Sequence, residues 1–304
     1  ASTLNSTWIL MNSATDVWEG GLGSSSNALG KYLMDHHLGI GAGGYVEGYE
    51  DKYTFGRRAN GFYIPRFRNV GNDKRDYLRG FGYQGGGSRQ SWNRGVNDMS
   101  FGADYKDAMT KPGPWTMNLG GFGETLPYHE NKMYLDPNKK DQWGLPTVTF
   151  DAEIKENEKI MRKDMMVQAA EMFDAAGFKD IQQYDKGYSM GLGIHEMGTA
   201  RMGRDPKTSV LNKYNQLHSV SNVYVTDGSG MTSAGNTNPS LTYMALTARA
   251  VDHAFKELKK MNDQHAIDYI TQLKGLGVWS AQMFLMFNLN RPDIFPTKDI
   301  GLIR

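Results

Sequence analysis

The stretch from Gly191 to Val251 constrains the fold more than any other part of the sequence, because three unlike pieces follow one another in fixed order. First, His195 stands three residues before a Gly-Thr pair. A short β-branched strand, predicted at 223–226, then ends in Asp227-Gly228-Ser229. Last, Asn238-Pro239 stands where a long helix begins, and proline is favoured in the first turn of a helix. A packed core does not need this combination, so these pieces predict a site for chemistry.

The order and spacing of these pieces resemble the C-terminal part of the glucose-methanol-choline (GMC) family of FAD-dependent oxidoreductases. The resemblance implies that His195 is the active-site base and that Asn238 is the second active-site residue. It also implies that Asp227 and Gly228 approach the FAD diphosphate, and that the backbone at Asn238 and Pro239 lies under the flavin ring. A Leu-Met-Asp-His signature at 33–36 matches the same family and places His36 near the cofactor.

The residue types suit that chemistry. Alcohol oxidation removes a hydroxyl proton and a hydride, and the flavin takes the hydride, so the protein must supply a base and a positioning group. The imidazole of His195 suits the first task and the amide of Asn238 suits the second. Read singly, His195 could be a structural histidine and Asn238 a helix cap. The three motifs in register favour the active-site interpretation, and we expect an alcohol of the sugar or polyol class as the small-molecule substrate.

Composition and net charge exclude several other classes of protein and of site. The net charge of +1 does not indicate a globally basic nucleic-acid binder, and no apolar run approaches the roughly 18 residues of a transmembrane helix. The absence of cysteine excludes disulfides, thiolate zinc sites and cysteine nucleophiles. No histidine pair has metal-ligand spacing with a carboxylate, so no metal site is predicted. Thirty-six glycines beside 16 tyrosines favour a loop-rich β protein.

Periodicity predicts two helices. Residues 151–176 carry apolar side chains at three- and four-residue steps, and Gly177 suits a left-handed stop. The second helix begins near Asn238 and ends at Lys259-Lys260, where the helix dipole favours cations. The best strand candidates are 62–67, 78–83, 115–119 and 148–150, and Pro65 confines the first to a sheet edge or to two short pieces. By physical reasoning alone, 124–146 is turns and a loop.

The N-terminal region resembles an interior part of the family. Residues 1–13 resemble a helix of its FAD-binding domain, but the strand, GxGxxG turn and helix that bind the ADP half of FAD are not found. The run Gly85-Gly86-Gly87 lacks the strand before it and the helix after it that such a turn requires. We therefore expect the chain to be the C-terminal part of a longer protein, and to bind FAD weakly or not at all. Any electron acceptor is left open: oxygen, a quinone or a cytochrome.

Residues 263–304 resemble a different family, the helix-hairpin-helix DNA glycosylases of the 3-methyladenine type. The resemblance implies that 273–277, with Gly275 and Gly277, forms the hairpin that binds a DNA phosphate, and that Asp299 is the catalytic aspartate. Trp279 stands where lyase-active members carry a lysine. The segment is too short to hold a base-flipping pocket, so we expect no glycosylase activity from it, and DNA is a partner only under this alternative. We further expect the segment to be separable from the rest.

These observations predict an α+β fold. Residues 1–40 would be a remnant of an FAD-binding α/β domain, 41–190 mainly a substrate-binding domain with an antiparallel sheet flanked by helices, 191–262 the FAD-binding and active-site segment, and 263–304 a small all-α helix-hairpin-helix tail. The predicted function is FAD-dependent oxidation of the CH–OH group of an alcohol. The alternatives left open are DNA N-glycosylase activity and a non-catalytic product that only retains family residues.

Overall fold

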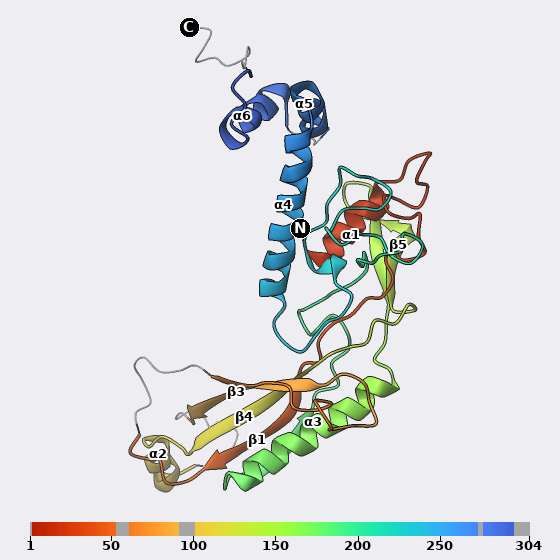
Figure 1. Ribbon diagram of the computed structural model, residues 1–304. Helices are drawn as coiled ribbons and strands as arrows, with labels where there is room; N and C mark the ends of the chain where they lie inside the picture. Colours follow the sequence, from red (N-terminus) through yellow and green to blue (C-terminus); the bar gives the residue numbers. More distant parts are fainter. Residues whose placement is uncertain (1, 53–60, 91–100, 273–275, 295–304) are drawn as a thin grey trace.

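The computed structural model describes residues 2–52, 61–90, 101–272 and 276–294 (Figure 1). Its larger sheet has five strands in the order β2-β3-β4-β1-β7, and all neighbours are antiparallel. These strands are β1 (Ile40–Val46), β2 (Phe62–Ile64), β3 (Phe81–Arg89), β4 (Trp115–Gly123) and β7 (Lys179–Asp185). The long helix α3 (Glu156–Ala175) packs along one face of this sheet, so its core is closed on that side (Figure 1).

Glycines in the sheet let α3 approach the strand backbone. A Cβ added at Gly121 would lie 2.8 Å from the sulfur of Met165, and one added at Gly123 would lie 2.8 Å from the sulfur of Met161. Both methionines are fully buried, together with Phe81 and Tyr83 of β3. The flexible thioether side chains fill the flat surface that the glycines leave. This explains why a glycine-rich strand can have a well-packed face.

A second region carries α1 (Thr3–Asn12), the hairpin of β5 (Lys132–Lys140) and β6 (Pro146–Asp151), and the short 3-10 turn η2 (Gly228–Gly230). Its core draws on distant parts of the chain: Leu10, Ala28, Ala200, Val210, Leu211, Leu217 and Val225. Because α1 packs against η2, the N-terminal helix directly supports the Asp227-Gly228-Ser229 motif.

The helix α4 (Ser240–Lys260) leads away from these two regions, and α5 (Asp263–Thr271) and α6 (Val278–Asn288) pack at its far end (Figure 1). Leu258 of α4 joins the small core of the tail, and Phe255 stacks on Phe284 with ring centroids 5.5 Å apart. The predicted apolar face of α4 is formed but largely exposed, since Leu241 and Met244 are 77% and 67% accessible. The remaining helix, α2 (Ala103–Met109), is short.

The predicted α+β class is confirmed, and so are the helices at 3–12, 156–175 and 240–260. Gly177 has φ 80° and Pro239 immediately precedes the first residue of α4, as the sequence predicted. The strand β2 ends at Ile64, before Pro65, and lies at the sheet edge. Strand candidates at 115–119 and 148–150 correspond to β4 and β6.

Three sequence predictions were wrong. Residues 132–140, read as loop, form β5, whose pairing with β6 is irregular between Leu135 and Lys140, around Pro137. The strand placed at 78–83 begins at Phe81 and runs through the three glycines to Arg89, because β4 pairs with it along that whole length. The run 223–226 is no regular strand: its pairing is limited to one isolated bridge, Gln216 to Tyr224, with backbone hydrogen bonds from Leu217 to Val223 and from Val225 to Asn215.

Candidate active site

Two histidines meet in the centre of the motif region. The Nδ1 atoms of His36 and His195 are 2.9 Å apart, and the two rings stand nearly perpendicular at 77°. The Nε2 of His36 lies 3.0 Å from the carbonyl oxygen of Gly235. Phe122 of β4 borders both rings. The structure thus brings together two residues that are 159 positions apart and that the sequence placed in one site.

The loop that carries His195 is held by the buried carboxylate of Asp35. One oxygen accepts the backbone N–H groups of His36 (2.7 Å) and His195 (3.1 Å), and the other accepts those of Gly191 (2.8 Å) and Gly193 (2.9 Å). A carboxylate accepts such bonds strongly, because its charge assists each of them. Asp35 therefore fixes the backbone position from which the His195 side chain projects.

The Gly-Thr pair that follows His195 needs glycine for a steric reason. Gly198 has φ 82°, and a Cβ there would lie 2.0 Å from the carbonyl oxygen of Tyr32. Next to this contact, Met34 and Met197 exchange two backbone hydrogen bonds of 2.8 and 2.9 Å. The close approach of these two segments is what sets His36 beside His195.

Burial lowers the pKa of both imidazoles and so favours their uncharged form. Desolvation lowers the pKa of His195, against the opposing effect of the Asp35 and Glu196 carboxylates. Burial, and then repulsion from His195, lowers the pKa of His36 in the same direction. His195 remains partly accessible whereas His36 is 4% exposed. A neutral, partly accessible imidazole can accept a proton from a bound molecule.

Asn238 lies away from the histidine pair, in a hollow of about 700 Å³ bordered by the strands β2 and β3. Its side-chain oxygen accepts a hydrogen bond of 3.1 Å from Gln84, which leaves the amide N–H groups directed elsewhere. Among the described residues, no hydrogen bond joins Asn238 to His195 directly. The two are connected through His36 and the carbonyl of Gly235, three residues before Asn238.

Asp227 lines a second hollow, of about 620 Å³, together with Ser240, Tyr243 and Met244 from the first turns of α4. The Asp227 carboxylate accepts bonds from the Ser6 hydroxyl and from the backbone and hydroxyl of Ser229, so it holds the turn η2 in place. A Cβ at Gly228 would meet the Thr3 hydroxyl at 2.3 Å, which explains the glycine. In the described structure no side chain caps the N-terminus of α4.

These features suit the flavin side of an FAD molecule. The uncapped N-terminus of a long helix offers backbone N–H groups and a positive dipole end to an anionic or electron-rich group. The hollow of about 620 Å³ beside this N-terminus has room for such a group. No cluster of three or more His, Cys, Asp or Glu side chains suitable for a metal ion occurs in the described ranges. Likewise, none of the helices described is long and apolar enough to cross a membrane.

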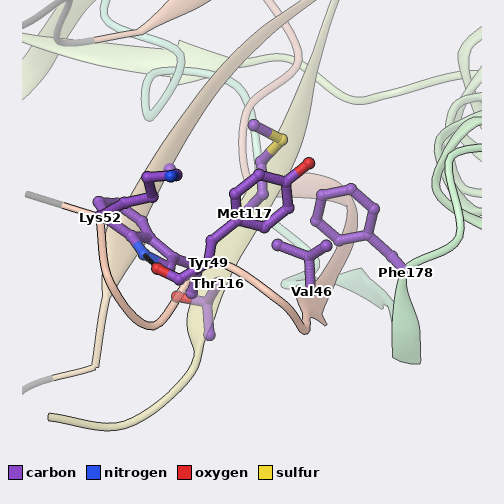
Figure 2. A pocket seen from close by; sticks show the side chains of 8 residues that line it. Val46, Tyr49, Lys52, Thr116, Met117 and Phe178 are labelled. Atoms are coloured by element: carbon purple, nitrogen blue, oxygen red, sulfur yellow. Dashed lines mark hydrogen bonds between the residues drawn. The ribbon is translucent and has the colours of Figure 1, made fainter.

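A further cavity, of about 260 Å³, lies at the far end of β1 from the histidines (Figure 2). Figure 2 shows Val46, Met117 and Phe178 grouped around the ring of Tyr49, with Lys52 farther to one side. Lys52 forms an ion pair of 3.0 Å with Asp51. Because β1 has seven residues and rises about 3.3 Å per residue, this cavity is roughly 20 Å from the histidine pair and separate from it.

Comparison with known proteins agrees with this geometry. Residues 127–247 match the family model described as GMC oxidoreductase. This part of the chain is a GMC oxidoreductase C-terminal domain. The chain is 31% identical over 289 residues to the 2-methyl-1,2-propanediol dehydrogenase of Mycolicibacterium austroafricanum, covering 87% of this chain and 48% of that protein. It is 26% identical over 258 residues to the fructose dehydrogenase large subunit of Gluconobacter japonicus, covering 83% and 45%. The chain thus spans less than half the length of either relative.

A short part of the chain is similar to another family. It is 36% identical over 47 residues to DNA-3-methyladenine glycosylase 1 of Schizosaccharomyces pombe, which covers 16% of this chain and 21% of that protein. Of the residues that the sequence analysis named for this alternative, Gly277 is the exposed residue before α6, whereas Gly275 and Asp299 lie outside the described residues. The helices α5 and α6 flank the predicted hairpin.

The sequence analysis missed Asp35 and Glu124. Asp35 belongs to the Leu-Met-Asp-His signature of the GMC segment, and its place beside His36 was the available signal. Glu124 is 3% exposed; it forms an isolated backbone bridge with His36, and its side chain contacts Ser233 and Arg79. Its position at the end of a glycine-rich strand gave no signal, because the contacts come from three distant segments.

Proposed function

We propose that this chain carries the active-site half of an FAD-dependent oxidoreductase that oxidises the CH–OH group of a small alcohol, a polyol or a sugar. The observation that carries the proposal is the partly accessible imidazole of His195, whose Nδ1 is held 2.9 Å from Nδ1 of His36 in the part of the chain that matches a GMC domain. Two relatives named as dehydrogenases of a diol and of fructose favour the substrate class.

In this proposal His195 is the base. The substrate O–H bond breaks and its proton passes to the free ring nitrogen of His195, while the carbon becomes a carbonyl by losing a hydride. FAD, when bound, supplies the acceptor for that hydride. Asn238 has its oxygen bonded to Gln84, so its amide N–H group is the part that would orient the substrate oxygen.

The residues proposed to hold FAD are Asp227, Gly228, the backbone at Asn238 and Pro239, and the N-terminus of α4. Asp227 would act through the turn η2, whose backbone it fixes, since its own oxygens are already bonded. His36, which the resemblance placed near the cofactor, is bonded at both ring nitrogens within the protein. Its contribution would therefore be made through His195.

Flavin reduction tests the proposal. The protein, with FAD supplied in large excess and oxygen removed, is mixed with 1,2-diols, polyols and ketohexoses, and loss of the oxidised flavin absorbance is followed by stopped flow. We expect bleaching with at least one of these classes, and a rate about 10²–10⁴-fold lower for His195→Ala. Asn238→Ala should lower the rate less. The matched control is His129→Ala, an exposed histidine that contacts the Asn27 carbonyl, and its rate should equal that of the unmodified protein.

The result that contradicts the base assignment is an unchanged rate of flavin reduction in His195→Ala. Absence of bleaching with all three classes, despite FAD bound as judged by flavin fluorescence, would contradict the oxidoreductase function.

The DNA glycosylase alternative has weaker support. It depends on a similarity over 47 residues, and the described apolar residues of α5 and α6 are used to form a core with Leu258. A base-flipping enzyme needs a pocket for the extruded base. Binding of the protein to DNA containing an abasic site, with release of a methylated base, would support this alternative.

A further inference from the structure

The hydrogen bonds of the histidine pair determine where the protons are. We propose that His36 is a positioning residue that fixes His195 in the tautomer with its proton on Nδ1, so that Nε2 of His195 carries the lone pair. The assignment of the tautomer is independent of the proposed function; its catalytic consequence rests on that function.

The first step concerns His36. Its Nε2 is 3.0 Å from the carbonyl oxygen of Gly235, and a carbonyl oxygen can only accept a hydrogen bond. Nε2 of His36 must therefore carry a proton. A neutral imidazole has one N–H and one lone pair, so Nδ1 of His36 is left as an acceptor.

The second step concerns the contact between the rings. Two nitrogens at 2.9 Å need a proton between them, and Nδ1 of His36 cannot provide it if that ring is neutral. Burial and the neighbouring His195 both lower the pKa of His36, which supports the neutral form. The proton therefore belongs to Nδ1 of His195, and its Nε2 is unprotonated.

The surrounding groups keep His195 as the donor and His36 as the acceptor of the hydrogen bond between the two rings. The backbone N–H of each histidine is bonded to the same oxygen of Asp35, which fixes both starting points. A ring flip of His195 would place a C–H group against the lone pair of His36 and lose the bond. The other charged groups nearby are the carboxylates of Glu196, adjacent in sequence, and Glu124, whose backbone bridges to His36.

This arrangement gives His36 a role comparable to that of a carboxylate which orients a catalytic histidine. When His195 takes the substrate proton at Nε2, it becomes an imidazolium with both nitrogens protonated. Its Nδ1–H then donates to the lone pair of His36 while the charge lies near the Asp35 carboxylate. The pair is thus ready to take up a proton on one side only, the side that faces away from His36.

The tautomer can be measured without cofactor or substrate. Protein with ¹⁵N-labelled histidine is studied at pH 7.5 by long-range ¹H–¹⁵N correlation, in which protonated and unprotonated ring nitrogens are well separated. His195 is assigned by its loss in His195→Gln. We expect a protonated Nδ1 and an unprotonated Nε2. A protonated Nε2 in the unmodified protein would overturn the proposal.

Two variants of His36 isolate its effect. His36→Leu removes the acceptor, and we expect the Nδ1–H form of His195 to lose its dominance. His36→Asn places a carbonyl oxygen where Nδ1 was, and it should restore that form. His129→Leu serves as the matched control and should leave the His195 signals unchanged. An unaltered tautomer in a folded His36→Leu would overturn the proposal; if that variant does not fold, failure of His36→Asn to keep the Nδ1–H form decides against it.

Flavin reduction then separates the two proposals. Under the conditions given above, His36→Leu should reduce flavin at least tenfold more slowly, and His36→Asn should recover most of the rate. If the unmodified protein has the expected tautomer but reduces no flavin, the proposed function fails and the assignment of His36 stands. If flavin is reduced but His195 carries its proton on Nε2, the assignment fails and the function stands.

Discussion

Replacing Asp35 should release the loop that carries His195. The carboxylate is 1% exposed and accepts four backbone N–H groups, so Asp35→Ala leaves all four without their partner. Two of the donors, His36 and Gly193, are buried, whereas Gly191 is exposed and His195 is partly so. Water can replace the carboxylate only at the last two.

The magnitude follows from the two buried donors. Leaving a buried donor unsatisfied costs about 1–3 kcal/mol, so the two together cost about 2–6 kcal/mol. That is a large fraction of the roughly 5–15 kcal/mol by which a domain is stable. Asp35→Asn keeps one oxygen but turns an amide N–H group towards two backbone donors, so it should also destabilise the loop, by less than the alanine substitution.

Hydrogen exchange is the appropriate assay, because the chain has several separate cores and a single unfolding free energy would mix them. The opening free energy of the Gly193 and Met197 amides should fall by about 2–6 kcal/mol in Asp35→Ala. Amides of α3 should be unaffected. Asp51→Ala, which removes an exposed ion pair with Lys52, is the control and should change neither set. One unsatisfied buried donor costs at least about 1 kcal/mol. If the opening free energies of Gly193 and Met197 stayed within about 0.5 kcal/mol of the unmodified protein, the proposed role of Asp35 in holding the loop would be refuted.

Three further predictions concern other parts of the chain. Gly198→Ala should abolish the exchange protection of Met34 and Met197, because a Cβ would lie 2.0 Å from the Tyr32 carbonyl; retained protection would contradict the steric argument. Burial lowers the pKa of His37 to about 3, below the value near 6.5 in the unfolded chain, so unfolding takes up a proton and stability falls as the pH drops from 6.5 towards 3. Near pH 5, where the unfolded histidine is almost fully protonated and the folded one is not, His37→Leu should remove about 1.4 kcal/mol per pH unit of that slope. The opening free energy of the α3 amides, measured by hydrogen exchange at several pH values, would keep its slope if the idea is wrong. Deleting 263–304 should leave amide protection in 191–258 intact apart from the last turn of α4, where Leu258 loses its cover, and loss of protection throughout that range would show the tail to be part of one domain.

Contacts of Arg291 connect the tail to α4 across the proposed boundary after residue 262. Arg291 donates to the carbonyl oxygens of Leu258 and Met261, 2.6 and 2.7 Å away, and pairs with Asp263. These bonds satisfy carbonyls at the C-terminus of α4 that would otherwise face water. They explain why a tail too short for an independent core is ordered at this position. Whether it is a domain of its own stays a prediction that the deletion tests.

The helices were predictable from sequence because their signals are local. Gly177 ends α3 through its own backbone conformation, and Pro239 starts α4 because it needs no N–H partner. The strands β1 and β3 were missed or displaced because both are rich in glycine, which ordinarily weakens a strand. Both strands are stabilised by pairing with β4. The glycines of β4 are in turn covered by Met161 and Met165, some forty residues away in the sequence. No local pattern contains that information.

In the candidate site, too, local motifs could be predicted from the sequence whereas tertiary contacts could not. The sequence named His195, His36 and Asn238 through their motifs, but it could not show that the first two share a hydrogen bond while Asn238 bonds to Gln84. Nor could it rank Asp35 above its neighbours, because three of the four N–H groups that its carboxylate accepts belong to a loop more than 150 residues away. A buried carboxylate without such donors would be costly. The residue is explained only by its tertiary partners.

The four residues 33–36 explain why His195 and His36 must move together. Leu33 donates to the carbonyl of Asn131, Met34 pairs with Met197, and His36 bridges to Glu124 at the end of β4. This short extended segment therefore contacts the hairpin region, the His195 loop and the five-stranded sheet in turn. A displacement of the sheet relative to the motif region would pull on His36, and through Asp35 it would pull equally on the backbone of His195. Any closure of the two regions around a substrate would thus carry the histidine pair as one unit and keep its hydrogen bond.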